Sequence, residues 1–150
     1  MKQCWAALVV LTLAAFIPVT ATAQSGTPSP SGERMSGELG QNFPNPFNPE
    51  TRIPFAVGDP PTCTDRSRLY RVSLKVYNVL AQLVAIPVLQ GGTSGNAGRP
   101  IDNLMLTCEE YTAFWDGKYL NSTREVASGI YLYRLEIDGM ARVKKMIVMK

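Results

Sequence analysis

Few side chains in this chain of 150 residues could perform chemistry, and histidine is absent from the sequence. Its absence excludes a Ser-His-Asp triad, a histidine general base and a histidine-ligated zinc or haem. Glu109 and Glu110 are the only adjacent pair of acidic residues. Neighbours on a strand point to opposite faces, so these two carboxylates cannot share a proton. The sequence therefore predicts a protein that is not an enzyme.

Metal and redox chemistry find equally little support in the sequence. Asp116 is followed by only two further oxygen ligands, Asn121 and Ser122, which are too few for a calcium loop. Two cysteines lie outside the amino-terminal region, and they lack the Cys-x-x-Cys spacing of redox catalysts. Two thiols without histidine also cannot complete a structural zinc site. No metal and no cofactor is expected.

The amino terminus has the pattern of a removable secretion signal. Lys2 supplies a positive charge, and Ala6–Ile17 form an apolar run with a single polar residue. This run is too short for a membrane-spanning helix, which needs about 20 apolar residues. A small-x-small triplet that ends at Ala23 predicts cleavage before Gln24. We therefore expect residues 1–23 to be a signal peptide and the mature protein to be exported, with no integral membrane segment.

Export bears on the cysteines and on the charge of the mature chain. In an oxidising compartment, Cys63 and Cys108 favour one structural disulfide over two free thiols. The mature chain holds 14 basic and 12 acidic residues, because Lys2 leaves with the signal. A net charge of +2 is too small to indicate binding to nucleic acid or to a membrane surface.

The elements that must position any functional residue are strands. Residues 24–38 are rich in Ser, Gly and Pro and are predicted to be a flexible linker. After them the hydrophobic period is two, most clearly over Tyr131–Ile137, which ends in the hairpin signal Asp138-Gly139. We predict an all-β fold over residues 39–150, an immunoglobulin-like β-sandwich of about seven strands, with a barrel as the lesser alternative. The strands are expected at Thr51–Val57, Arg71–Tyr77, Leu83–Leu89, Ile101–Thr107, Tyr111–Trp115, Tyr131–Ile137 and Val143–Met149.

Two segments stand out as possible recognition features. In the Asn-Pro segment, Gln41–Pro49, prolines and asparagines fix a kinked path that presents Phe43 and Phe47. Both rings are expected to plug one end of the sandwich rather than to form a ligand-binding patch. From residue 139 onward the chain carries four basic side chains and no acidic one. Such charges either protect an edge strand from aggregation or form a docking surface for an acidic partner.

Five segments in a fixed order resemble a known family. They are Leu39–Pro49, Val72–Leu80, Trp115–Gly117, Ala127–Tyr131 and Lys144–Val148. Together they resemble the C-terminal sorting domain of the type IX secretion system and its relative, the immunoglobulin-like domain of flagellar hook-capping proteins. Ala81 stands where this family usually has glycine, which suggests a turn that alanine tolerates.

The resemblance implies a module that secretion machinery recognises in the periplasm and brings across the outer membrane to the cell surface or the extracellular space. Its partners would then be the proteins of that machinery or of a surface assembly. The alternative is a structural or assembly module, or an extracellular domain that binds by strand addition at an open edge. The positions that match the family's motif are Pro44, Asn45, Pro46, Phe47, Gly129, Ile130, Tyr131, Lys144 and Lys145.

Overall fold

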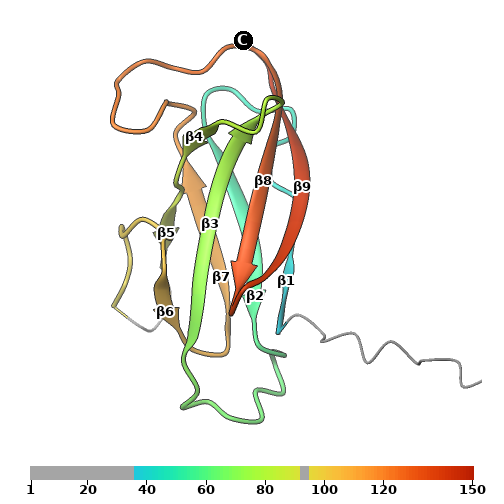
Figure 1. Ribbon diagram of the computed structural model, residues 1–150, viewed down its shortest axis with the longest axis vertical. Coiled ribbons are helices and arrows are strands. Elements are labelled where there is room, and N and C mark those ends of the chain that lie inside the picture. Colours follow the sequence, from blue (N-terminus) through green and yellow to red (C-terminus); the bar gives the residue numbers. More distant parts are fainter. Residues whose placement is uncertain (1–35, 92–94) are drawn as a thin grey trace, which may run out of the picture. The chain divides into compact units, whose positions relative to one another are not determined.

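Two antiparallel β-sheets build the fold of the computed structural model, which describes residues 36–91 and 95–150 (Figure 1). The first sheet has the order β1-β2-β7-β5, and its strands are β1 (Gly37–Leu39), β2 (Thr51–Val57), β7 (Glu109–Trp115) and β5 (Val88–Gln90). The second sheet has the order β4-β3-β8-β9, formed by β4 (Leu83–Ala85), β3 (Tyr70–Asn78), β8 (Gly129–Ile137) and β9 (Met140–Val148). A short β6 (Leu104–Leu106) also pairs with β3. The predicted all-β sandwich is confirmed.

The core lies between the two sheets and follows the predicted alternation. Val72, Leu74 and Val76 of β3 are fully buried, and the side chains between them are more exposed. The inward face of β8, from Tyr131 to Ile137, is buried in the same way. Each large apolar side chain buried in this way contributes about 1.5–3 kcal/mol. The two central strands of the second sheet therefore hold the sandwich together.

Among the described residues, nine strands form where about seven were predicted, for two local reasons. The expected strand Leu83–Leu89 is divided at Pro87, so that β4 joins the second sheet and β5 joins the first. Pro87 has no N–H to donate to a ladder, and its carbonyl accepts a hydrogen bond from the Ile101 amide at 2.9 Å. The other addition is β1, which pairs with the end of β2.

The amino-terminal predictions fall largely outside the described residues. The signal peptide (1–23), its cleavage site between Ala23 and Gln24, and residues 24–35 of the predicted linker all lie there. The sandwich begins with β1 at Gly37, two residues before the predicted boundary. In the described part of the chain, no helix is long and apolar enough to cross a membrane.

The Asp138-Gly139 turn was predicted from sequence and is confirmed. Asp138 and Gly139 have φ angles of 50° and 87°, and Ile137 pairs directly with Met140 across them. This two-residue turn sets the register of the whole β8–β9 ladder. In that register the even-numbered residues of β9 exchange hydrogen bonds with β8, and the odd-numbered residues point their backbone groups away from it.

The disulfide predicted between Cys63 and Cys108 is present, with a Cα–Cα distance of 5.6 Å. It joins the long loop after β2 to the residue before β7, on the buried side of the sandwich. Gly58, at the start of this loop, has a φ of 75°, and a Cβ there would overlap the Cys108 side chain. The disulfide therefore packs in a space that only glycine leaves open.

The turn between β3 and β4 differs from the expectation drawn from Ala81. Ala81 has a φ of 59°, in the left-handed region that favours glycine, so a turn suited to alanine is the wrong description. The turn is held instead by Asn78, whose side-chain oxygen accepts hydrogen bonds from the Leu80 and Gln82 amides, each at 3.0 Å. These two bonds support the residue that is conformationally strained.

Candidate recognition surface

The predicted motif residues come from three distant stretches of the chain. Lys144 and Lys145 lie midway along β9, opposite Tyr133 and Leu132, and the other two stretches, residues 44–47 and 129–131, meet at one end of the sandwich. This is the end at which the carboxyl terminus lies (Figure 1). The Phe47 amide donates to the Ile147 carbonyl, and the Met149 amide donates to the Phe47 carbonyl, both at 3.0 Å. The Ile147 amide donates to Asn45 Oδ1, also at 3.0 Å. Hydrogen bonds therefore hold residues 45–47 against the end of β9.

Aromatic packing joins the same segments inside the sandwich. Phe47 is buried, and its ring centroid lies 5.4 Å from that of Trp115. Trp115 in turn lies 5.9 Å from Tyr131, in an edge-on arrangement. The prediction that Phe47 plugs the sandwich is confirmed. For Phe43 it is wrong, because its backbone pairs with Arg52 on the outer side of β2 and leaves the side chain 77% exposed.

A buried polar network holds the Asn-Pro segment on the core, and sequence reasoning missed it. Asn42 Nδ2 donates to the Pro44 carbonyl and to Thr51 Oγ1, both at 3.0 Å. The backbone N–H of Asn42 donates to Tyr133 Oη at 3.1 Å, and Tyr133 Oη donates to the Gly40 carbonyl at 2.9 Å. An asparagine near prolines signals a turn. Nothing in the sequence pairs it with a tyrosine 91 residues away.

The two tyrosine hydroxyls at this end act as structural hydrogen-bond donors. Burial raises the pKa of Tyr133 above its usual value, although the hydrogen bond from the Asn42 amide opposes the shift. Burial also raises the pKa of Tyr131, and neighbouring Tyr119 adds to that effect. Tyr131 Oη donates to the Ala127 carbonyl at 3.0 Å. Both hydroxyls therefore stay neutral near pH 7 and tie the core to the loops.

Two glycines set the backbone path at this end of the sandwich. Gly129 starts β8 with a φ of 153°, and a Cβ at this position would meet open space. Gly117 has a φ of 72°, and its Cβ would overlap the Pro49 carbonyl. The Trp-Asp-Gly turn and the Asn-Pro segment consequently touch, backbone against backbone.

The basic end does not form a single patch. Lys144 and Lys145 are both exposed, but successive residues of β9 face opposite sides of the sheet. Lys144 shares the inward side with Arg142 and buried Met146, and Lys145 lies on the outer side. Lys150 Nζ pairs with Glu125 Oε2 at 2.6 Å, and this hydrogen bond lowers the pKa of Glu125.

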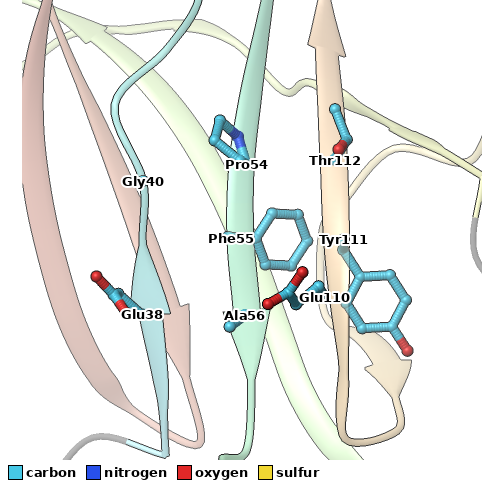
Figure 2. Close-up of a pocket in the computed structure, with 8 residues that line it drawn as sticks. All are labelled: Glu38, Gly40, Pro54, Phe55, Ala56, Glu110, Tyr111 and Thr112. Carbon is cyan, nitrogen blue, oxygen red and sulfur yellow. The ribbon is translucent and has the colours of Figure 1, made fainter. Parts of the chain in front are cut away.

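A shallow hollow of roughly 400 Å³ lies on the outer face of the first sheet (Figure 2). Glu38, Ala56 and Glu110 lie in one row across β1, β2 and β7. The backbones of Glu38 and Glu110 are therefore two strand spacings apart, roughly 9.5 Å. Glu109 pairs with Val57 on the inward side, so it and Glu110 face opposite ways, as predicted. Within residues 36–91 and 95–150, no group of three acidic or cysteine side chains could hold a metal ion.

The chain matches no family model, and neither curated proteins nor solved structures give a match. The structure itself establishes the class of protein, a two-sheet, all-β sandwich with one disulfide.

Proposed function

We propose that this sandwich is a non-enzymatic, exported recognition module that works as a sorting domain of the type IX kind. The observation that carries the proposal is the assembly of the three motif blocks, residues 44–47, 129–131 and 144–145, at one end and along the adjoining strand pair. Secretion machinery would read this surface in the periplasm and bring the attached protein to the cell surface.

The rigidity of the motif surface supports recognition of one folded shape. Residues 45–47 form two hydrogen bonds with Ile147 of β9 and one with Met149 just after it, and Phe47 anchors them in the core. A surface that is ordered before binding loses little entropy when a partner docks. The Asn-Pro segment thus has the properties of a preorganised docking element.

The test is a fusion of residues 36–150 behind an exported fluorescent protein, in a host that has this secretion machinery. Surface fluorescence, measured as the fraction removed by external protease, is expected for the intact fusion. Lys144→Ala/Lys145→Ala should leave the reporter in the periplasm, because it removes both motif lysines. The matched control, Arg66→Ala/Arg71→Ala, removes two exposed charges elsewhere and should reach the surface.

Retention of the intact fusion in the periplasm, with the domain folded by circular dichroism, would refute the sorting function. The alternative is then an extracellular binding or assembly module. One observation favours that reading, because Val79 and Leu80 at the tip of the β3–β4 turn are 69% and 75% exposed. Concentration-dependent association in sedimentation experiments, lost in Val79→Ser/Leu80→Ser, would support it.

A further inference from the structure

One edge of the second sheet is open over half of its length. β9 is an outer strand of this sheet, with β8 on one side only. Its odd-numbered residues direct their N–H and C=O groups away from β8, toward a position where a further strand would lie. The neighbouring edge of the first sheet is β1, which is three residues long and does not pair with β9.

The Asn-Pro segment covers only the far half of this edge. Gln41 Nε2 donates to the Lys145 carbonyl at 3.2 Å, and the polar backbone groups of Ile147 are taken by Asn45 and Phe47. In the part of the chain that the structure describes, no such bond reaches the outward backbone groups of Ala141 and Val143 or the Lys145 amide. The open stretch is therefore Ala141–Lys145, which we call the β9 edge.

The side chains of the β9 edge carry positive charge on both faces. Arg142 and Lys144 lie on the inward side yet are exposed, because β1 is too short to cover them. Lys145 lies on the outer side. Among the described residues, none of the three has an ion pair. The acidic neighbour on β8, Glu136, is already paired with Arg134 at 2.7 Å.

We propose that the β9 edge binds an extended acidic segment of a partner protein as an added strand. The inference rests on the proposed function, since it names the partner chemistry of the same surface. Backbone groups of residues 141, 143 and 145 would supply the pairing, and the three cations would select acidic side chains. A second copy of the chain is disfavoured, because pairing two β9 edges would oppose like charges.

The probe is the peptide acetyl-Glu-Glu-Val-Glu-Val-amide, whose order places valine opposite Val143 in an antiparallel pairing. Titration into the ¹⁵N-labelled domain should shift the amide resonances of residues 141–145. The amides of Val143 and Lys145 should also become protected from hydrogen exchange. The peptide Glu-Glu-Pro-Glu-Val has the same charge but lacks the central donor, so it should bind about tenfold more weakly.

Two variants separate backbone pairing from charge. Val143→Pro removes an outward N–H that only solvent contacts, which an edge strand tolerates, and should weaken binding about tenfold. Lys144→Glu/Lys145→Glu should abolish binding, whereas Arg66→Glu/Arg71→Glu makes the same change in net charge and should retain it. Thermal unfolding of each variant confirms that the sandwich has formed. If Val143→Pro does not fold, the comparison of the two peptides still tests pairing.

Several results would overturn the inference. These are the absence of shifts at millimolar peptide, equal binding of the proline peptide, or shifts centred outside the β9 edge. Equal binding of heparin and the peptide, with no protection from exchange, would show a merely anionic site. The fusion assay keeps the two proposals apart. Surface display of Val143→Pro at the wild-type level would refute binding at the β9 edge without contradicting the sorting function. Periplasmic retention of the intact fusion would contradict the sorting function alone.

Discussion

Replacing Tyr133 by phenylalanine tests whether the buried polar network stabilises the Asn-Pro segment. The tyrosine ring is fully buried, and its hydroxyl donates to the Gly40 carbonyl and accepts from the Asn42 amide. Phenylalanine fills the same space but satisfies neither group. Asn42 is only 2% exposed, so its amide has no access to water, whereas Gly40 is partly exposed.

The cost of this substitution follows from those two groups. A buried amide without a partner costs about 1–3 kcal/mol, and the loss of an ordinary hydrogen bond costs about 1 kcal/mol. We therefore expect Tyr133→Phe to lower the free energy of unfolding by about 2–4 kcal/mol. Urea unfolding with the disulfide intact measures this change, and Trp115, the only tryptophan after the predicted signal, reports it by fluorescence.

The matched control is Tyr77→Phe, at a partly exposed position on the outer face of β3 where no hydrogen bond to the hydroxyl is formed in the described part of the chain. It should change stability by no more than about 0.5 kcal/mol. A loss within about 0.5 kcal/mol for Tyr133→Phe would refute the argument, and so would an equal loss in both variants. Water would then be replacing the hydroxyl at Asn42.

The same pair of variants yields a prediction about alkaline pH. The pKa values of Tyr111, Tyr131 and Tyr133 are raised in the folded protein, chiefly by burial. The unfolded chain then loses these protons first, so stability is fully present below about pH 10 and falls as pH rises through the folded values. Each tyrosine contributes a slope of up to about 1.4 kcal/mol per pH unit. Urea midpoints from pH 9 to 11 should fall less steeply in Tyr133→Phe than in Tyr77→Phe, and equal slopes would contradict this assignment.

Three further predictions concern the backbone and the disulfide, each measured as a change in urea unfolding. Gly117→Ala should lower the free energy of unfolding by about 3–5 kcal/mol, since it combines a left-handed φ with overlap of the new Cβ on Pro49. Gly129→Ala should lower it by only about 1–3 kcal/mol, because only the φ angle is strained there. Similar losses at both sites would contradict the overlap at Gly117. Cys63→Ala/Cys108→Ala removes a disulfide that links positions 45 residues apart and should lower the free energy of unfolding by about 4 kcal/mol. A loss below about 1 kcal/mol would mean that the loop is ordered without the disulfide. Ala81→Gly should raise the free energy of unfolding by about 0.5–1 kcal/mol, because removing the strain of a left-handed alanine outweighs the extra entropy that glycine gives the unfolded chain. A less stable variant would show that the φ of Ala81 is unstrained.

The sequence predicted those features of the fold that depend on local patterns. Period-two alternation located β3 and β8, and the Asp138-Gly139 pair located the hairpin between β8 and β9, because few residues adopt its φ angles. It failed at β1, where Gly37–Leu39 lack any alternation and form a strand only because the end of β2 offers an unpaired edge. Pairing of this kind is decided by tertiary structure.

The candidate surface was predicted residue by residue but not as an arrangement. Phe43 and Phe47 are both followed closely by proline or asparagine, and no local rule separates the exposed ring from the buried one. The distinction arises because Phe47 meets Trp115, which comes from a strand more than sixty positions away. The adjacent lysines were predicted to lie on a strand, whose alternation places them on opposite faces, but only the structure shows that this strand, β9, is at the edge of its sheet.

Arg142 and Lys144 on the inward side of an edge strand have two physical explanations, with different consequences. Such charges keep edges from pairing with other chains, and that protective role needs only a charge that resists burial. Glutamate at both positions would serve it equally well, so Arg142→Glu/Lys144→Glu should then stay monomeric and still be sorted. Recognition of an acidic strand needs positive charge, so the same variant should remain monomeric but lose both peptide binding and surface display. The sign of the charge, rather than its presence, therefore separates a protected edge from a docking site.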